Sequence, residues 1–180
     1  MAPPYNVIIP YLYIGGKDAI YRDIKFDTII NCTQDVPCAN YCKNCIRVPV
    51  RQSTKDCITF FNIITKTDVL EQIHNSIQNK KTVLVHCQMG MHRSCSLVAC
   101  YFMKYYNMNI KDSMAFVKSK RRVAFNPVYK LFCVIQMYYN YLIKKTNNLA
   151  VKEIENNREK EQINVKKENP PNNLQNLVRK

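Results

Sequence analysis

Short runs in which hydrophobic residues alternate with polar ones, or stand together, dominate the first half of the chain and indicate β-strands. Residues 5–16 alternate around Pro10 and end at two glycines, which predicts a hairpin at the edge of a sheet. Residues 17–25 predict a short surface helix. Three apolar runs are typical of buried strands: 28–32, 46–50 and 82–85.

Longer segments with apolar residues three or four positions apart predict amphipathic helices. One covers 58–78 and leads into the third buried strand, which makes a right-handed parallel βαβ unit. Others cover 94–105 and, capped by Asp112, the residues up to Lys120. Asn126-Pro127 predicts the start of a last helix, whose core face carries Val128, Leu131, Phe132, Ile135, Tyr139 and Leu142.

The composition of the chain changes at Thr146. Residues 146–180 contain no aromatic residue, nine of these thirty-five residues are asparagine, and Pro170-Pro171 breaks any helix. Such a segment buries too little apolar surface to order itself alone. We therefore expect one domain, 1–145, of the α/β class, with a central, mostly parallel twisted sheet flanked by helices. The polar tail, 146–180, is expected to be helical to about Val165 and disordered beyond.

The candidate functional stretch lies where the strand 82–85 ends. Cys87 follows this strand, Arg93 comes six residues later, and the helix 94–105 begins directly afterwards. The free backbone N–H groups at a helix start and the positive end of its dipole form an anion site. Gly90 allows the loop to curl so that successive N–H groups point inward. The sequence therefore predicts a phosphate cradle in this loop.

The residue types in the loop suit nucleophilic chemistry on a phosphate. An anion site of this kind lowers a cysteine pKa from about 8.5 to roughly 3.5–7.5, which makes Cys87 a thiolate. The planar fork of Arg93 can hold two phosphate oxygens, and Ser94 can donate a hydrogen bond to the sulfur. His86 can orient the loop. The predicted phosphate-binding residues are His86, Gln88, Met89, Gly90, Met91, His92 and Arg93, and neither a metal nor a cofactor is expected.

This pattern, Cys-x5-Arg-Ser after a strand that ends in His-Cys, is the signature of the cysteine-dependent protein phosphatases. Over residues 5–143 the chain resembles the dual-specificity phosphatases, especially their small viral members. The resemblance implies the cysteine-phosphatase fold, with Cys87 as nucleophile and Arg93 as phosphate clamp. Met89 and Cys95 depart from the commonest pattern of the loop. The other landmarks lie at 12–16, 26–33, 46–50, 116–122 and Asn126.

The general acid of the family is missing from its usual place. Relatives carry an aspartate just after the strand that here is 46–50, but this chain has Arg51-Gln52 there. Asp56 is the nearest carboxylate, although its position also suits a helix N-cap, and Asp35 is a weaker candidate. Without an acid, substrates with good leaving groups, such as phosphotyrosine, are favoured.

Three functions remain open from the sequence. The first is a protein phosphatase for phosphotyrosine and, if Asp56 is the acid, phosphoserine or phosphothreonine. The second is an RNA 5′-triphosphatase of the same fold, although those relatives carry Arg-Thr where this chain has Arg93-Ser94. The third is a phosphate-binding interaction module, which would not need the nucleophile.

Net charge and cysteine content indicate which partners and which cellular location to expect for the protein. The formal net charge of +14 attracts phosphorylated partners, yet no RNA-binding signature occurs, so phosphoproteins are favoured over RNA. Nine cysteines, an odd number, without a signal segment predict a reducing cytoplasmic or nuclear location. No stretch has the roughly 20 apolar residues of a membrane span. The basic run 118–122 resembles a nuclear signal, or it steers phosphate. The oligomeric state stays open.

The remaining cysteines raise two hypotheses. Cys42-x2-Cys45, with Cys38 and Cys32 nearby, has a spacing that suits zinc, although an ordinary cysteine-rich loop is favoured because no further pair of this kind exists. A low-pKa Cys87 is also prone to oxidation. Cys95 and Cys100 on the following helix, or Cys32, are then candidates for a disulfide with it.

Overall fold

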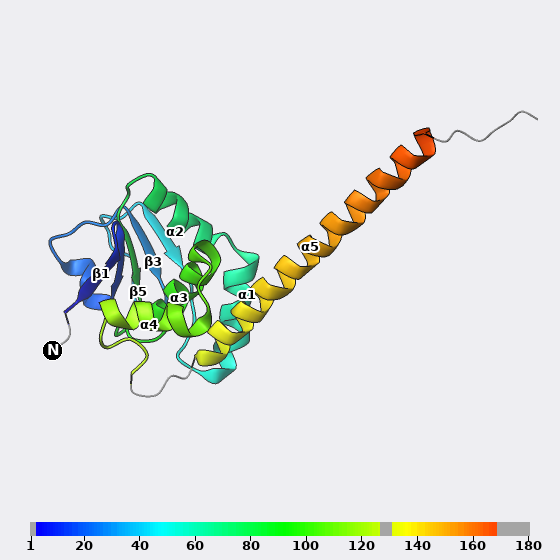
Figure 1. The fold of residues 1–180 in the computed structure, drawn as a ribbon. Helices are drawn as coiled ribbons and strands as arrows, with labels where there is room; N and C mark the ends of the chain where they lie inside the picture. Colours follow the sequence, from blue (N-terminus) through cyan, green and yellow to red (C-terminus); the bar gives the residue numbers. More distant parts are fainter. Residues whose placement is uncertain (1–2, 127–130, 169–180) are drawn as a thin grey trace, which may run out of the picture. The chain divides into compact units, whose positions relative to one another are not determined.

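A five-stranded sheet organises the computed structural model, which describes residues 3–126 and 131–168 (Figure 1). In spatial order the strands are β1, β2, β5, β3 and β4. Only β1 runs antiparallel to its neighbour, so the sheet is mostly parallel, as predicted. The strand bounds are Tyr5–Ile9 for β1, Leu12–Gly15 for β2, Thr28–Asn31 for β3, Asn44–Arg47 for β4 and Val83–His86 for β5.

The strand predicted at 46–50 begins and ends earlier in the structure. β4 ends at Arg47, although the backbone N–H of Val48 still donates to Asn31 O at 2.9 Å. Pro49 follows and has no N–H to continue a ladder of hydrogen bonds. Residues 48–50 therefore leave the sheet as a loop, and Val50 is free to approach the functional site.

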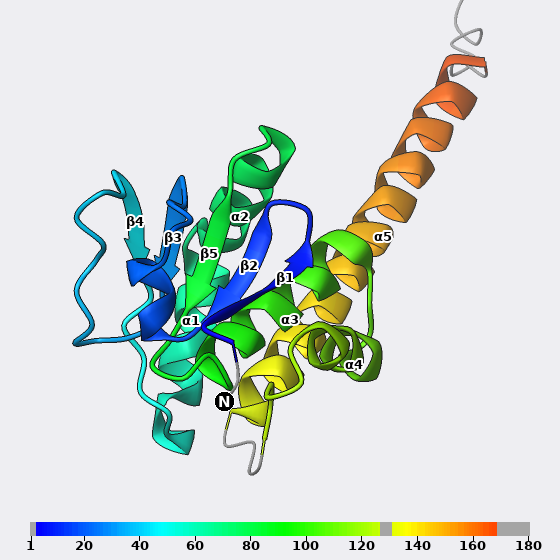
Figure 2. The same cartoon turned by 90° about the vertical axis from the view of Figure 1, so that its left-hand side faces the viewer.

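Helices cover one face of the sheet (Figure 2). Helix α2 contacts β3 and β5, α3 contacts β2 and β5, and α4 contacts β1. The opposite face is covered by the short helix η1 and the loops around β3, which bury a cluster that includes Ile20, Phe26 and Leu84. Burial on both faces explains why the central strands β3 and β5 are buried along their whole length and mostly apolar. The helix bounds are Lys17–Tyr21 (η1), Thr54–Asp56 (η2), Cys57–Lys66 (α1), Val69–Gln78 (α2), Arg93–Tyr106 (α3), Ile110–Lys120 (α4) and Phe132–Glu168 (α5).

Two predicted helices differ from the observed ones. The segment 58–78 is two helices, because Thr67 is extended; its hydroxyl donates to Ile63 O at 2.7 Å and accepts from Val69 N at 3.4 Å. The cap of α4 is Asn109, whose side chain accepts from Asp112 N at 2.9 Å. Threonine and asparagine side chains compete with helical hydrogen bonds in this way, and the apolar spacing alone does not reveal it.

The chain divides into two units, Met1–Tyr141 and Leu142–Lys180. In the first unit, α5 buries Val134, Ile135 and Tyr138. Phe132 is 44% exposed, so its predicted place in the core is wrong. The predicted start at Asn126-Pro127 and the core residue Val128 lie partly or wholly outside the described residues, since 127–130 are not described.

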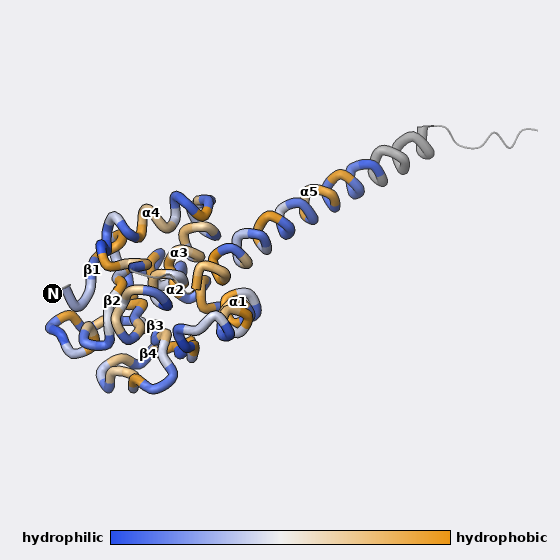
Figure 3. The backbone as a smooth tube through the Cα atoms, turned by 90° about the horizontal axis from the view of Figure 1, so that it is seen from below, coloured by the Kyte–Doolittle hydropathy of each residue, from blue (hydrophilic) through white to orange (hydrophobic). Residues whose placement is uncertain are grey.

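The second unit is helical from Leu142 to Glu168, and the predicted end at Val165 is three residues short. Its described side chains are polar with isolated apolar ones between them (Figure 3), and Ile143 and Ile154 are exposed. The predicted disorder after the helix falls on residues 169–180, outside the description. Among the helices of the described ranges, none has both the length and the apolar character needed to cross a bilayer.

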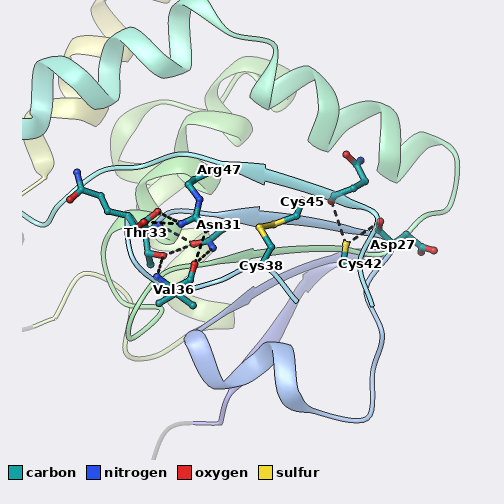
Figure 4. Close-up of a disulfide and its surroundings, with 10 residues drawn as sticks. Asp27, Asn31, Thr33, Val36, Cys38, Cys42, Cys45 and Arg47 are labelled. Atoms are coloured by element: carbon teal, nitrogen blue, oxygen red, sulfur yellow. Dashed lines mark hydrogen bonds between the residues drawn. A yellow bond between two sulfur atoms is a disulfide. The ribbon is translucent and has the colours of Figure 1, made fainter. Parts of the chain in front are cut away.

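Two disulfides occur that the sequence did not predict. Cys38 is bonded to Cys45 across the loop between β3 and β4 (Figure 4), and Cys57 is bonded to Cys133. The Cys42 thiol lies 3.4 Å from Asn44 O instead of joining a cluster. Within the described residues no group of three or more histidines, cysteines and carboxylates could hold a metal. The cysteine-rich loop is thus a disulfide-closed loop in this structure, and its geometry does not support the zinc hypothesis.

Candidate active site

The predicted phosphate loop lies between the end of β5 and the start of α3, at the carboxyl ends of the parallel strands. Its backbone is tied to the neighbouring strands on both sides. Cys87 N donates to Gly15 O at 3.3 Å, and Cys32 N donates to His86 O at 2.8 Å. Ligands of open α/β sheets bind at this end of the strands.

Cys87 is surrounded by groups that stabilise a thiolate. Its sulfur accepts a hydrogen bond from Gly90 N at 3.2 Å and one from the Ser94 hydroxyl at 3.4 Å. Burial alone would raise the pKa of Cys87, but the Ser94 hydroxyl and backbone, the Arg93 charge and the Gly90 N–H together hold this pKa below its ordinary value. The thiolate predicted from the sequence therefore has a structural basis.

Gly90 is required at its position, as predicted. Its φ is +63°, a left-handed conformation that side chains rarely adopt. A Cβ at this position would collide with the Gly15 carbonyl group and would lie 2.7 Å from an Arg121 nitrogen. The loop can therefore curl toward the sulfur only with glycine here.

The guanidinium group of Arg93 has one nitrogen with a hydrogen-bond partner and one without. Nη1 donates to Val50 O at 3.1 Å, which fixes the side chain. Nε is buried and has no hydrogen-bond partner among the described residues. A buried donor normally has a partner. Since Arg93 is close enough to act on the charge of Cys87, this unpaired N–H is a candidate donor to an anion bound at the loop.

The other predicted loop residues act through their backbone. The carbonyl groups of Gln88 and Met91 accept hydrogen bonds from Lys17 N at 3.1 Å and Phe125 N at 2.7 Å, and that of His92 accepts one from Ser96 N at 2.8 Å. The Gln88 and Met91 carbonyl groups are thus tied to neighbouring segments, and that of His92 belongs to the first turn of α3. Of the loop N–H groups, that of Gly90 faces the sulfur. The Met89 side chain is 65% exposed at the surface of the loop.

Arg121 is the functional residue whose role the sequence did not reveal. The basic run 118–122 predicts a nuclear signal or a phosphate-steering patch at the surface, but the Arg121 side chain is 2% exposed. Nε donates to Gly90 O at 2.6 Å, Nη2 donates to Met89 O at 3.3 Å, and Nη1 donates to Asn6 Oδ1 at 2.7 Å. Arg121 therefore supports the catalytic loop from behind. In the sequence, Arg121 is marked only by the basic run 118–122. Such a run does not reveal which of its residues is buried.

The candidate acids are not brought to the sulfur by any described contact. Asp56 occupies the N-cap position of α1, but its side chain makes no capping hydrogen bond. Asp35 is exposed on the loop after β3. Arg51 and Gln52, which stand in the segment where the resemblance places the family's acid, are also exposed. The capping role proposed for Asp56 is therefore limited to its backbone.

His86 is fully buried at the end of β5, and neither ring nitrogen has a hydrogen-bond partner among the described residues. The orienting role predicted for His86 from the sequence stays a prediction. Burial, reinforced by the charges of Arg47 and Arg93, lowers the pKa of His86 from 6.5 to about 4. The ring is neutral near pH 7.

The His86 pKa predicts an acid-sensitive fold. Between pH 6.5 and about 4 the unfolded chain takes up a proton at His86 that the folded chain does not, so the free energy of unfolding falls as the pH is lowered through this range. The loss amounts to about 3 kcal/mol. Urea unfolding of His86→Gln over the same range should show a shallower pH dependence. His74→Gln is the control, and an equally shallow slope in that variant would contradict the assignment to His86.

Cys32 lies beside Cys87 because of the strand register. Asn31 and His86 are partners in the parallel pair of β3 and β5, and Cys32 and Cys87 are the next residues. Neighbouring strands lie about 4.8 Å apart, within the Cα separation of roughly 4.4–6.8 Å that a disulfide spans. Burial and the charge of Cys87 raise the pKa of Cys32.

Peroxide is therefore expected to link these two cysteines reversibly. It oxidises the Cys87 thiolate to a sulfenic acid, which the Cys32 thiol converts to a disulfide with loss of water. Dithiothreitol should restore activity to the wild type but not to Cys32→Ser, in which Cys87 is oxidised further. Cys100→Ser should behave like the wild type. A peptide that links Cys87 to Cys95 in mass spectra would instead identify Cys95 as the partner.

Comparison with known proteins agrees with this geometry. The family model described as "Dual specificity phosphatase, catalytic domain" matches residues 12–141. A protein of Invertebrate iridescent virus 6 named as a tyrosine phosphatase, 123R, is 32% identical over 120 residues, which are 66% of this chain and 80% of the viral one. The tyrosine-protein phosphatase MSG5 of Saccharomyces cerevisiae is 29% identical over 119 residues. These are 61% of this chain but only 23% of the yeast protein.

Solved structures show the same fold. Human DUSP28 superimposes with a TM-score of 0.70 at 19% identity, covering 79% of this chain and 97% of that one. The chain belongs to the dual specificity phosphatase family, and its residues 12–141 form the catalytic domain of that family. The predicted cysteine-phosphatase fold and the resemblance to small viral members are thereby confirmed.

Proposed function

We propose that the protein is a phosphatase that hydrolyses phosphotyrosine in protein substrates through a phosphocysteine intermediate on Cys87. The observation that supports this most directly is the pairing of a low-pKa sulfur with the unsatisfied, buried N–H of Arg93. A phosphate ester supplies what each group lacks. It offers phosphorus to the thiolate and oxygen acceptors to the guanidinium group.

The proposed reaction has two steps. The Cys87 thiolate attacks phosphorus, a P–S bond forms, and the P–O bond to the tyrosine breaks as the phenolate leaves. Water then attacks the phosphocysteine, which releases inorganic phosphate and restores the thiolate. In both steps Arg93 and the inward N–H groups stabilise the charge on the phosphoryl oxygens, and Ser94 stabilises the sulfur as it leaves.

The substrate preference depends on whether a general acid can protonate the leaving oxygen. A phenolate leaves without prior protonation more easily than a serine or threonine alkoxide does. With Gln52 in place of the family's acid, phosphotyrosine is the preferred substrate and phosphoserine and phosphothreonine are slow ones. Cleavage of a phosphoanhydride also releases a good leaving group, the RNA 5′-diphosphate. An RNA 5′-triphosphate is therefore the natural competing substrate.

Turnover measured side by side tests the proposal. The purified wild type should release phosphate from a phosphotyrosine peptide faster than from a matched phosphothreonine peptide, and faster than from a 5′-triphosphorylated RNA. Cys87→Ser serves as the background. Preferred cleavage of the RNA would replace the proposal with the triphosphatase function. Phosphate binding without release from any of the three would indicate a binding module.

A further inference from the structure

A cavity of about 260 Å³ lies directly beside the catalytic loop. Met89 and Met91 of the loop form one wall, and Pro3, Pro4 and Val123 add further apolar surface. Gln88, the residue directly after Cys87, also lines the cavity. The residues next to a phosphotyrosine bound at Cys87 would therefore lie within reach of it, because an extended chain advances about 3.3 Å per residue.

The segment after β2 is fixed against the same loop. Lys17 N donates to Gln88 O at 3.1 Å, and Gly16 N donates to Pro4 O at 2.9 Å. A Cβ at Gly16 would lie 3.3 Å from Gln88 O, so the two backbones approach closely. Figure 2 shows the N-terminal segment, η1 and the loop after β5 at one end of the sheet. These hydrogen bonds hold Asp18 in the lining of the cavity.

The two charged groups of the cavity differ in their availability. Arg121 lies at its buried side and directs its guanidinium group at carbonyl oxygens of the catalytic loop and at Asn6. Asp18 is exposed, and no described residue forms a hydrogen bond or ion pair with its side chain. The cavity thus combines apolar walls with one exposed carboxylate, and its one guanidinium group is already occupied by hydrogen bonds.

We propose that this cavity binds a lysine or arginine side chain that lies near the phosphotyrosine of the substrate, an inference that rests on the proposed function. The methylene stem of such a side chain packs on the methionine and proline surfaces, while its cationic head reaches Asp18. The net charge of +14 would by itself favour acidic peptides. A preference for a basic neighbour would therefore report this local site and not the overall field.

Phosphotyrosine peptides of one background sequence, with arginine, leucine or glutamate at each of the three positions on either side, test the proposal. In the wild type, arginine at one or two positions should give a kcat/KM about two- to fivefold above leucine, the size of an exposed ion pair. Asp18→Asn should reduce this arginine-to-leucine ratio to about one. Asp23→Asn, which removes an exposed acid outside the cavity, should keep the ratio of the wild type.

The dissociation constants of the same peptides for Cys87→Ser, measured by calorimetry, give the preference without turnover. Failure of the wild type to hydrolyse any peptide would reject the proposed function, while these constants still decide the cavity. An arginine-to-leucine ratio near one in the wild type would overturn the inference. So would a ratio that Asp18→Asn leaves intact, one that Asp23→Asn lowers equally, or a preference for glutamate.

Discussion

Replacement of Cys87 by serine is expected to lower the turnover of phosphotyrosine peptides by roughly 10⁴-fold or more, the scale that follows from the removal of a catalytic nucleophile. A serine hydroxyl is not ionised at neutral pH, so it cannot form the covalent intermediate. The affinity for inorganic phosphate should be retained. The cradle consists of backbone N–H groups and Arg93, and the hydrogen bond from Gly90 N can be made to an oxygen as well as to sulfur.

Arg93→Lys should also fail, by about 10²- to 10³-fold, because an ammonium group cannot replace the planar fork at the phosphate. Here the phosphate affinity should fall as well, since the single nitrogen of lysine cannot occupy both the position of Nη1 at Val50 O and the separate position from which a second nitrogen of Arg93 would reach the phosphate. Arg22→Lys, at an exposed position, is the matched control. Steady-state kinetics and phosphate titration measure both effects, and a Cys87→Ser enzyme with the wild-type rate would end the phosphocysteine mechanism.

The next prediction concerns the protonation of the leaving group. We expect Asp56→Asn to change neither the rate nor the stability appreciably, because the Asp56 side chain makes no capping hydrogen bond. If Asp56 were the general acid, the same substitution would slow alkyl phosphate hydrolysis by roughly 10²- to 10⁴-fold and would remove the basic limb of the pH profile. Rates for phosphotyrosine and phosphothreonine peptides, compared in the wild type and in Asp56→Asn, distinguish the two cases.

Installation of an acid at the family's position gives the complementary result. Gln52→Asp should raise phosphothreonine turnover by about 10²-fold while changing phosphotyrosine turnover far less, because only the alkoxide needs a proton. Gln52→Glu provides a variant with the same charge and a longer reach. No gain for phosphothreonine in either variant, together with a strong loss in Asp56→Asn, would show that the acid is Asp56.

The central part of the site could be predicted from the sequence because it is local. The cysteine, the glycine, the arginine and the serine lie within eight residues, between a strand and a helix that the apolar pattern also reveals. The two side-chain and backbone donors to the Cys87 sulfur, the Ser94 hydroxyl and Gly90 N, both come from this segment. No distant contact is needed to propose the chemistry.

The parts that could not be predicted depend on contacts between distant residues. Val50 approaches Arg93 only because β4 ends at Arg47 and Pro49 breaks the ladder. Cys32 approaches Cys87 only through the register of β3 with β5. In the sequence, Val50 resembles the end of a strand, and Cys32 is one of several cysteines in apolar surroundings.

The helix boundaries failed for a different reason. The apolar spacing over 58–78 reports which face is buried, and two consecutive helices can share such a face. The break at Thr67 depends on a hydroxyl that accepts from Val69 N and donates to Ile63 O. Propensity does not forbid threonine in a helix, so this choice is made by local hydrogen bonds.

The arginine behind the catalytic loop also makes the loop depend on the N-terminal segment. Arg121 Nη1 donates to Pro3 O at 3.3 Å and to Asn6 Oδ1 at 2.7 Å, while Nε of the same side chain holds Gly90 O. The first strand is therefore connected to the catalytic loop through the Arg121 side chain. Removal of Pro3 would take one of these acceptors from Arg121, and substitution of Asn6 would take the other. Changes in the N-terminal segment would therefore reach the catalytic loop through a single side chain.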